Sequence, residues 1–317
     1  MARIAVTSPI FVHLPHLRDE LRAIHPDVKF KDTPERFAED ELIAFLDGAE
    51  VAVIGLDRIN ERVLAALPRL KTVVCSSVGL DHVDAAALRR CGVRVGWRAG
   101  ANRQSVAELT IALMIDALRR VSFYSRGLRE GVWPAWRVGR HLQGRIVGIH
   151  GCGNIGKTVA ELLQPFRVTL LASDKVDYAE FYRKFDVTPV PAEELRRRSE
   201  IVTIHLPKNA STTGLYDAKT LDQLRPGAIL VNTARGGIVD ESALNERLKD
   251  GRIAAAAFDV FAMEPTKDME LVNLPNLIAT PHIAGSANEA WEAVARAAMK
   301  NIDDNFLPEP GVYPFDW

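Results

Sequence analysis

Short apolar runs alternate with helical patterns along most of this chain. Runs of about four to eight apolar residues are typical of buried strands, whereas apolar residues spaced three or four positions apart are typical of amphipathic helices. The alternation predicts an α/β protein in which helices join parallel strands. The predicted strands are Arg3–Thr7, Val51–Ile54, Thr72–Cys75, Val93–Val95, Arg145–His150, Val168–Ala172, Val187–Val190, Ile201–Leu206, Ala228–Asn232, Ile253–Phe258 and Asn276–Ala279.

Helical periodicity fills most of the intervals between these strands. One pattern, Ala101–Val121, is apolar on more than one face and predicts a helix about 30 Å long that is buried between two bodies. We place the first domain crossover at the start of this helix, after residue 98. The other predicted helices are Leu14–Ile24, Glu35–Leu46, Glu61–Ala66, Lys157–Leu163, Ala192–Arg198, Asp217–Leu224, Asp240–Lys249 and a last helix that opens with a capping-box pattern at Ser286 and runs to about Asn305.

Two further stretches are interpreted from their side chains. Arg196–Arg198 is a charge run and is predicted to be a solvated helix end. Residues Ser122–Leu142 are loop-like and carry Trp133 and Trp136. Large aromatic side chains of this kind pack against a sizeable surface, which is either a partner chain or the protein's own domain.

The stretch from Gly144 to Asp174 has the order strand, glycine-rich turn, helix, strand and acidic residue. In a dinucleotide site Gly151 permits the tight turn, Gly153 lets a pyrophosphate approach the backbone, and Gly156 lets the helix pack close to the sheet. The free amides at the helix start attract phosphate charge. The alternative is a glycine-rich turn in an ordinary α/β protein, but the flanking strands and the acidic residue favour a dinucleotide site.

Asp174 closes this stretch and bears on the choice of cofactor. Its carboxylate is placed to accept hydrogen bonds from the two adenosine ribose hydroxyls, and it would repel a 2′-phosphate. NAD is therefore favoured over NADP. Lys175 follows directly and weakens that preference.

Composition and charge narrow the function classes. A length of 317 residues predicts two domains, and the 40 basic and 41 acidic side chains give a net charge of -1. This balance gives no support for a nucleic-acid or acidic-membrane partner. Cys75, Cys91 and Cys152 form no close-spaced framework and fit a reducing cytosol. With no signal peptide and no long apolar run, we expect a cytoplasmic protein without a membrane span, and no metal site is predicted.

Polar side chains follow three predicted strands at the point where each strand ends. Arg235, Asp259, Glu264 and His282 occupy these positions, and the glycine-rich turn follows a fourth strand. If all four strands are parallel in one sheet, these residues share the carboxyl edge, where ligands bind. Taken singly, each has an ordinary explanation as a surface arginine, a loop residue or a helix cap. Taken together, at matching strand ends, they favour a site.

The chemistry of this set points to alcohol oxidation. Oxidising an alcohol with NAD removes a hydride, which the cofactor takes, and a proton, which suits a histidine such as His282. A carboxylate such as Glu264 fixes the histidine tautomer and stabilises the imidazolium. An arginine such as Arg235 binds a carboxylate or polarises a carbonyl. The predicted substrate is therefore a 2-hydroxy or 2-keto acid.

A second turn, Ser76–Asp81, follows a predicted strand in the first part of the chain. It offers backbone amides and small side chains at a strand's carboxyl end, where open sheets bind ligands. The alternative is a plain strand-to-helix loop in which Asp81 caps the helix. The segment alone favours the second interpretation.

These motifs resemble one known family. The chain is similar to the D-isomer-specific 2-hydroxyacid dehydrogenases, the group that includes phosphoglycerate, glycerate, hydroxypyruvate/glyoxylate and formate dehydrogenases, and the resemblance covers nearly the whole chain. It is carried by Ser105–Glu108, Gly151–Gly156, His205–Pro207, Leu224–Glu241, Phe258–Phe261 with Glu264-Pro265, and Thr280–Gly285.

The resemblance implies roles for individual residues. Arg235 would bind the substrate carboxylate, His282 would be the acid/base with Glu264 as its partner, and Val78 and Gly79 would offer amides to the substrate. The implied cofactor-binding residues are Gly151, Gly153, Asn154, Ile155 and Gly156 at the pyrophosphate, Asp174 at the ribose, Asp259, Thr233 and Ala234 at the nicotinamide, and His205, Pro207, Arg235, His282, Ala284 and Gly285.

The family resemblance also implies an architecture. Two Rossmann-like, doubly wound parallel-sheet domains are expected, with residues 1–98 and 287–317 forming a discontinuous substrate domain and residues 99–286 forming the NAD-binding domain. A homodimer joined largely through the NAD-binding domain is implied.

The sequence departs from the family pattern at two places. The stretch Val95–Ala99 replaces the family's Asn-x-Pro, so Trp97 and Arg98 bear on substrate choice. The loop Ile54–Asp57 lacks the arginines that look like phosphate contacts, and Arg58 is displaced from that position. Both lower the expectation of a phosphoglycerate substrate, and a small substrate such as hydroxypyruvate or glyoxylate is favoured. Phosphoglycerate dehydrogenase, an enzyme for formate or phosphite, and a non-enzymatic NAD-sensing corepressor-like protein remain the alternatives.

Overall fold

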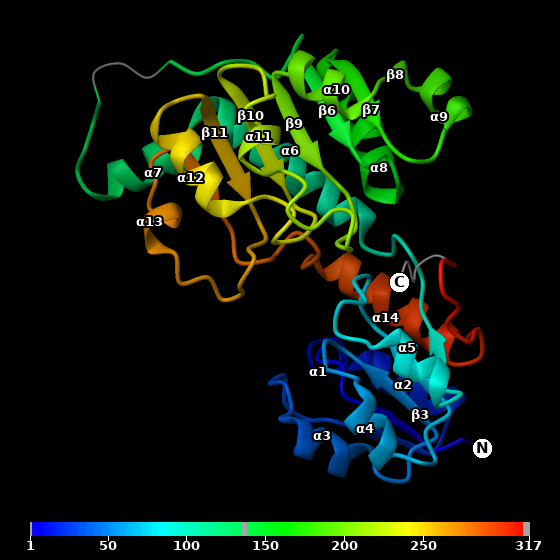
Figure 1. Cartoon of the computed structure of the whole chain (residues 1–317). Coiled ribbons are helices and arrows are strands. Elements are labelled where there is room, and N and C mark those ends of the chain that lie inside the picture. Colours follow the sequence, from blue (N-terminus) through cyan, green and yellow to red (C-terminus); the bar gives the residue numbers. More distant parts are fainter. Residues whose placement is uncertain (1, 135–137, 313–317) are drawn as a thin grey trace. The chain divides into compact units, whose positions relative to one another are not determined.

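The computed structural model describes residues 2–134 and 138–312, and Trp136 lies outside the described residues. The chain divides into two compact units: unit 1 comprises Met1–Asn102 and Ala287–Trp317, and unit 2 comprises Arg103–Ser286 (Figure 1). The first boundary lies four residues beyond the predicted one, because Ala101 packs against the core of unit 1. In the described residues, none of the helices combines the length and the apolar character that spanning a bilayer requires.

Unit 1 is built on a parallel sheet of five strands in the order β2-β1-β3-β4-β5. Its core has two halves, and the β-strands contribute alternate residues to each. The strands are β1 (Ile4–Val6), β2 (Val28–Phe30), β3 (Val51–Ile54), β4 (Thr72–Cys75) and β5 (Arg94–Gly96). The helices are α1 (Ile10–His13), α2 (His16–Ile24), α3 (Glu39–Leu46), α4 (Glu61–Ala66), α5 (Ala85–Arg90) and α14 (Asn288–Asn301).

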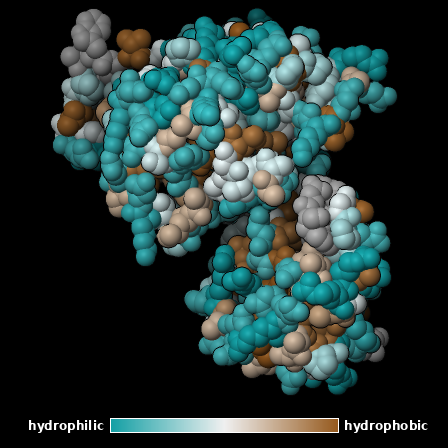
Figure 2. Space-filling view, viewed as in Figure 1, coloured by the Kyte–Doolittle hydropathy of each residue, from teal (hydrophilic) through white to brown (hydrophobic). Residues whose placement is uncertain are grey.

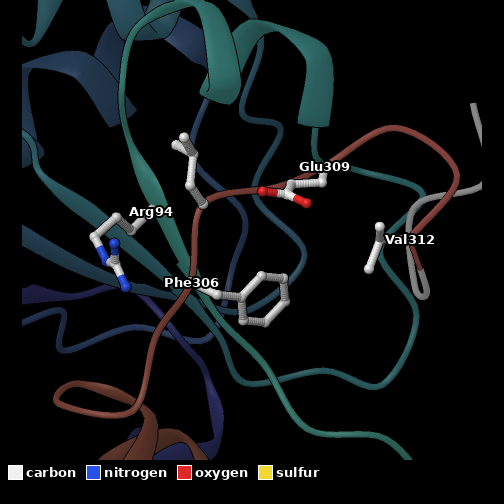
Figure 3. Close-up of a pocket in the computed structure, with 5 residues that line it drawn as sticks. Arg94, Phe306, Glu309 and Val312 are labelled. Atoms are coloured by element: carbon white, nitrogen blue, oxygen red, sulfur yellow. The ribbon is translucent and has the colours of Figure 1, made fainter.

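The end of the chain completes unit 1. Val294, Ala295 and Ala298 of α14 are buried in the same cluster as β1. A Cβ atom on Gly96 would lie 2.4 Å from the carbonyl oxygen of Asn301, so β5 and the end of α14 meet at a contact that only glycine allows. Beyond α14 the chain runs along the edge of β5. A surface cavity of about 540 Å³ beside this edge is lined by Arg94, Phe306, Leu307, Glu309 and Val312 (Figure 3).

Unit 2 is built on a parallel sheet of seven strands in the order β12-β11-β10-β9-β6-β7-β8. The sheet reverses its direction of winding at β6, as doubly wound folds do. The strands are β6 (Ile146–His150), β7 (Thr169–Ser173), β8 (Val187–Pro189), β9 (Ile201–Ile204), β10 (Ala228–Asn232), β11 (Ile253–Phe258) and β12 (Leu277–Ala279). The helices are α6 (Arg103–Arg119), α7 (Val121–Arg129), α8 (Asn154–Leu163), α9 (Ala179–Lys184), α10 (Ala192–Arg198), α11 (Ala218–Leu221), α12 (Glu241–Lys249) and α13 (Met269–Val272), with a 3-10 turn at Gln164–Phe166.

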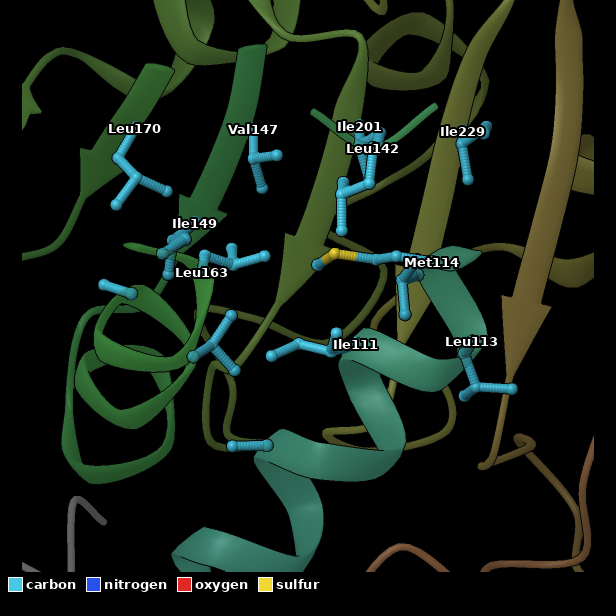
Figure 4. Close-up of a cluster of buried hydrophobic side chains, with 14 of the residues drawn as sticks. Ile111, Leu113, Met114, Leu142, Val147, Ile149, Leu163, Leu170, Ile201 and Ile229 are labelled. Carbon is cyan, nitrogen blue, oxygen red and sulfur yellow. The ribbon is translucent and has the colours of Figure 1, made fainter. Parts of the chain in front are cut away.

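Helix α6 covers one face of this sheet. Ile111 and Met114 point toward Val147 of β6 and Ile229 of β10 in a cluster of buried aliphatic side chains (Figure 4). The helix packs on α8 as well as on the strands. Burial on more than one side explains why its sequence is apolar on more than one face. The expected α/β fold with two doubly wound parallel sheets is therefore confirmed.

Some expectations about single elements were wrong. Residues Ser122–Leu142 were expected to form a loop, but their first part is helix α7, none of whose residues is buried. Three-residue β2 and short α5 were not predicted, because such short patterns do not stand out from loop sequence. The last helix has Ala287 as its N-cap and no side-chain cap, so the predicted capping box is absent.

The charge run at the end of α10 is not uniformly solvated. Arg196 is buried, with its guanidinium 5.9 Å from the Tyr216 ring centroid and its Nε donating to Gln223 at 2.9 Å. Arg197 and Arg198 do face solvent and pair with glutamates one turn earlier. The expectation was wrong for Arg196 alone, because that position turns toward the core of unit 2.

Candidate active site

The strand ends of unit 2 lie side by side along one edge of its sheet. Asn232, the last residue of β10, pairs with Phe258 at the end of β11, and Phe258 pairs with Ala279 at the end of β12. On the other side Asn232 pairs with Ile204, which in turn pairs with His150 at the end of β6. All pairings are parallel, so the segments that follow these strands start at the same carboxyl edge.

His282 and Glu264 meet at this edge. Nδ1 of His282 lies 2.7 Å from Oε2 of Glu264, and the other carboxylate oxygen of Glu264 accepts a hydrogen bond from the Phe261 amide at 3.0 Å. Each side chain is only partly exposed, 47% for His282 and 38% for Glu264. The carboxylate is thus held from both sides, and the contact at Nδ1 leaves Nε2 as the imidazole nitrogen for a proton-transfer partner.

Asp259 organises the loop that carries His282. It is fully buried, and Oδ1 accepts from the Thr280 hydroxyl at 2.6 Å and from the Ile283 amide at 2.8 Å, while Oδ2 accepts from the Ala284 amide at 2.8 Å. The Asp259 carbonyl also accepts from the His282 amide at 2.8 Å. His282 has a φ of 55°, a conformation that few residues other than glycine adopt. These bonds hold His282 in that conformation.

Arg235 lies in the turn after β10. Its Nη1 donates to the carbonyl of Ala234 at 2.7 Å, and its own carbonyl accepts from the buried side chain of Asn232 at 3.0 Å. The Thr233 hydroxyl lies 2.9 Å from that of Thr110 on α6. Sequence reasoning missed both Asn232 and Thr110, although an amide side chain at the last position of a buried strand was a usable signal.

Gly236 lies where the turn after β10 packs against the turn after β11. A Cβ atom here would lie 1.8 Å from the carbonyl oxygen of Phe261, so only glycine fits. Phe261 in turn donates its amide to Glu264. The segment that carries Arg235 therefore packs directly against the segment that positions Glu264. Sequence reasoning had no signal that separated this glycine from Gly237 beside it.

In the glycine-rich turn between β6 and α8, the surroundings of each glycine differ. Gly151 has a φ of +96°, and a Cβ atom there would lie 2.7 Å from the His205 carbonyl. A Cβ on Gly156 would lie 2.2 Å from the carbonyl oxygen of Gly151. Gly153 is different, because a Cβ there would point into open space. No side chain caps α8 at Gly153, so the first amides of the helix are available to an anion.

Asp174 ties the end of β7 to the same turn. Its Oδ2 accepts from the Cys152 amide at 2.6 Å and its Oδ1 from the Val176 amide at 2.9 Å. Each carboxylate oxygen keeps a further lone pair for a ligand hydroxyl. The ammonium of Lys175 lies 3.4 Å from the Ser211 hydroxyl, a contact that directs this cation toward the loop after β9.

Two histidines lie beside the turn, and His150 is buried whereas His205 is half-buried. Nε2 of His205 contacts the Thr203 hydroxyl at 2.9 Å, whereas its Nδ1 is buried without a partner in the described residues. Burial lowers the pKa of His205 to about 3. His150, which sequence reasoning missed, contacts the Tyr216 hydroxyl at 2.8 Å, and burial lowers its pKa to about 4. Both imidazoles are therefore neutral near pH 7, and the unpaired nitrogen of His205 can accept or donate one further hydrogen bond.

In unit 1, Val78 and Gly79 lie in the turn after β4. The Val78 carbonyl accepts from the Trp97 indole at 3.0 Å, and the Gly79 carbonyl accepts from the Ser77 hydroxyl at 2.9 Å. Neither residue's amide donates a hydrogen bond within the part of the chain that the structure describes. The carbonyls are thus held and the two amides are open, which is the arrangement that an anion site requires.

Comparison with known proteins identifies the family. The model of the D-isomer specific 2-hydroxyacid dehydrogenase NAD-binding domain matches residues 111–284. The chain belongs to this family. The matched stretch includes most of unit 2, from within α6 to the loop of His282, and it assigns NAD as the cofactor of this domain.

Individual relatives agree with this assignment. The D-3-phosphoglycerate dehydrogenase of Mycobacterium tuberculosis is 34% identical over 289 residues, which are 89% of this chain and 54% of that protein. The enzyme of the same name from Archaeoglobus fulgidus is 36% identical over 268 residues, or 84% of this chain and 51% of that protein. The chain therefore spans about half the length of the curated relatives it matches.

Solved structures match over nearly their whole length. The TT0316 protein of Thermus thermophilus is 30% identical, with a TM-score of 0.84, and the match covers 98% of this chain and 100% of that one. The D-lactate dehydrogenase of Aquifex aeolicus, solved with NAD and lactic acid, is 25% identical, with a TM-score of 0.83, and the match covers 97% and 100%.

The residues present in this 2-hydroxyacid dehydrogenase fold fit NAD. The open space at Gly153, the uncapped start of α8 and the spare lone pairs of Asp174 provide for the pyrophosphate and the ribose. The unpaired, buried nitrogen of His205 provides a further polar contact. These features lie on segments that follow β6, β7 and β9, which are neighbours in the sheet.

Proposed function

We propose that this chain is an NAD(H)-dependent oxidoreductase that interconverts a D-2-hydroxy acid and its 2-oxo acid. The observation that carries the proposal is the 2.7 Å contact between His282 and Glu264 at the carboxyl edge of the NAD-binding sheet. A histidine with a carboxylate on one ring nitrogen and the other nitrogen open is suited to proton transfer. The family to which the chain belongs supports the same reaction class.

The proton is assigned to His282. In the oxidising direction Nε2 takes the proton of the substrate hydroxyl, and in the reducing direction it returns a proton to the carbonyl oxygen. Glu264 accepts a hydrogen bond from the Nδ1–H group, which fixes the tautomer and stabilises the imidazolium that forms. When bound, NAD supplies the hydride acceptor or donor. The hydrogen bonds that Asp259 accepts from the loop of His282 keep the backbone of this loop in place in both directions of the reaction.

Substrate and cofactor contacts are proposed from both units. In unit 2 Arg235 is proposed to bind the substrate carboxylate through its guanidinium, and in unit 1 the open amides of Val78 and Gly79 are proposed substrate contacts. The cofactor-binding residues proposed for unit 2 are Gly151, Gly153, Asn154, Ile155 and Gly156 for the pyrophosphate, Asp174 for the ribose, Thr233, Ala234 and Asp259 for the nicotinamide, and His205, Pro207, Ala284 and Gly285 around it.

A small 2-oxo acid of the hydroxypyruvate or glyoxylate type is the proposed substrate. The loop Ile54–Asp57 places no arginine at the carboxyl edge of unit 1. The second candidate is phosphoglycerate dehydrogenase, which the names of the curated relatives favour. Purified protein with NADH and a panel of 2-oxo acids tests the proposal through the loss of nicotinamide absorbance. Turnover of a 2-oxo acid is expected, and binding of NADH without turnover of any panel member would favour the NAD-sensing alternative.

A homodimer formed through unit 2 is also proposed. Val121, Leu128, Val132 and Trp133 are each more than half exposed. The surface of unit 2 in Figure 2 is mostly hydrophilic, with isolated hydrophobic side chains. Large apolar side chains that are exposed together in one segment are a feature of interaction sites. Sedimentation should give the mass of a dimer, and Leu128→Glu should shift it to a monomer. The matched change Val176→Glu, at an exposed residue outside this segment, should not.

The three cysteines support a reducing compartment, and the cytoplasm is the proposed location. Cys75 and Cys152 are buried free thiols, and Cys91 is an exposed free thiol. Burial raises the pKa of both Cys75 and Cys152 to about 12, so neither reacts readily as a thiolate. A free, exposed Cys91 persists where thiols are kept reduced.

A further inference from the structure

Unit 1 has a topological switch point of its own. In the order β2-β1-β3-β4-β5, the chain passes from β1 to β2 on one side and from β3 onward on the other side. Open α/β sheets bind ligands at the carboxyl ends of the two strands that flank such a point. For unit 1 these strands are β1 and β3, so the segments that begin at Thr7 and Gly55 define a candidate ligand position.

Asp57 lies at this switch point. The hydroxyl of Thr7, which follows β1, donates to Oδ2 of Asp57 at 2.5 Å, and the Gly55 amide lies 3.4 Å from the same oxygen. Asp57 is only 6% exposed. Its second oxygen, Oδ1, accepts no hydrogen bond within the described residues and is not one of their fully buried unpaired atoms. One oxygen is therefore fixed, and the other is an open acceptor at the carboxyl edge.

Hydroxyl contacts connect this position to the turn after β4. Ser8 and Ser76 are both buried, and their hydroxyl oxygens lie 2.6 Å apart. The Ser76 hydroxyl also lies 2.8 Å from the carbonyl of Ile54, the last residue of β3. Ser76 opens the turn whose Val78 and Gly79 amides are the proposed carboxylate contacts. The turn that carries these amides therefore follows β4, the strand next to β3, and Asp57 lies in the segment that follows β3.

The charge at this position is negative. Asp57 makes no ion pair within the described residues. The adjacent Arg58 acts on Glu39, whose pKa its charge helps to lower, and the ammonium of buried Lys31 lies 3.8 Å from the Phe37 ring centroid. A phosphoryl group placed here would meet a carboxylate, whereas a hydroxyl would find an acceptor.

We propose that Asp57 determines substrate specificity by reading the C3 substituent of the 2-oxo acid. It accepts a hydrogen bond from a C3 hydroxyl and repels a C3 phosphoryl group. The substrate class is thus a hydroxyl-bearing, unphosphorylated 2-oxo acid. This inference rests on the proposed function, and it separates this chain from the phosphoglycerate dehydrogenases among its relatives.

The test compares two probes that differ only by the phosphoryl group, hydroxypyruvate and 3-phosphohydroxypyruvate. With NADH, the wild type should show a kcat/KM at least about a hundredfold higher for hydroxypyruvate. The reason is that the buried carboxylate accepts a hydrogen bond from the hydroxyl and repels the phosphoryl anion. Asp57→Asn removes the charge and keeps the shape, and it should reduce this ratio at least about tenfold, mainly through KM. Asp27→Asn, the same change before β2 at the opposite edge of the sheet, should leave the ratio unaltered.

The outcomes are distinguishable. A wild type that prefers the phosphorylated probe, or an Asp57→Asn variant with an unaltered ratio, overturns the role of Asp57 while leaving the proposed function intact. A wild type that reduces no 2-oxo acid overturns both. Asp57→Ser, which also removes the charge, serves as the second variant if circular dichroism shows that Asp57→Asn has not folded, and the same shift in the ratio is required of it.

Discussion

Oε2 of Glu264 lies 2.7 Å from Nδ1 of His282, although the two residues are separated by β12 and belong to different segments of the sheet edge. Each segment is fixed independently. The Phe261 amide holds the other oxygen of Glu264, and the buried carboxylate of Asp259 holds the loop of His282. The pair is therefore preorganised, a condition that proton transfer at a defined atom requires.

Glu264→Gln should lower kcat by about 10- to 100-fold for any 2-oxo acid that the enzyme reduces, because a neutral amide does not stabilise the imidazolium. The KM for NADH should change little. Steady-state kinetics measures both quantities. Glu270→Gln is the control, because Glu270 is an exposed residue of α13 that pairs with Lys249. Equal kcat values for Glu264→Gln and the control would rule out the assigned partnership.

Two glycines of the nucleotide turn should behave in opposite ways. Gly153→Val should leave the unfolding midpoint within a few degrees of the wild type and abolish NADH binding, because the new side chain enters open space where the pyrophosphate is proposed to lie. Gly156→Ala should lower stability by about 1–3 kcal/mol, because its Cβ overlaps the Gly151 carbonyl. Thermal unfolding and nicotinamide fluorescence measure the two effects. Unimpaired NADH binding by Gly153→Val would contradict the placement of the cofactor.

Much of the fold was predictable because parallel, buried strands give continuous apolar runs. Strands β3, β4, β10 and β11 have the predicted bounds, and the four chemically important segments follow strand ends as expected. Helix α7 was missed because none of its residues is buried, so no core-facing stripe marks it. The prediction for Arg196 was wrong because sequence alone does not show that Tyr216 and Gln223 contact this side chain in the core.

The site was predictable to a smaller extent. The topology implies that Arg235, Glu264 and His282 share an edge, but sequence gives neither the tether from Asp259 to residues 280–284 nor the contact between Gly236 and Phe261. Both depend on close approach between segments far apart in the chain. The same holds for Thr7 and Asp57, which are fifty positions apart and joined only through the strand order of unit 1.

Asp174 should control the choice between NADH and NADPH. Asp174→Ala should reduce the ratio of kcat/KM for NADH to that for NADPH at least about tenfold, because it removes an acceptor for the ribose and a charge that opposes a 2′-phosphate. It should also lower stability by about 1 kcal/mol, since the Cys152 and Val176 amides lose their partner. Asp177→Ala, at an exposed position nearby, is the control. A ratio that is unaffected by Asp174→Ala would contradict this role.

His150 should make unit 2 sensitive to acid. Burial lowers its pKa from 6.5 to about 4, so the imidazole is neutral in the native state near pH 7. Its contribution to stability is fully present above about pH 6.5 and is lost as the pH falls toward about 4. Between about pH 7.5 and pH 5 the loss amounts to about 2 kcal/mol, which His150→Gln should remove. Urea unfolding at both pH values measures the difference, and His141→Gln, at an exposed position, should retain the wild-type dependence. An equal acid loss in His150→Gln would refute the assignment.

The most direct test of the central claim is the turnover of His282→Ala with NADH and the best 2-oxo acid of the panel, measured together with NADH binding by fluorescence titration. We predict that kcat falls at least about a hundredfold, because the acid/base is lost, while the Kd for NADH stays within about threefold of the wild type. The loop should remain folded, because Asp259 holds it through the Thr280 hydroxyl and the amides of Ile283 and Ala284 rather than through the imidazole. A His282→Ala variant that keeps the wild-type kcat would contradict the account.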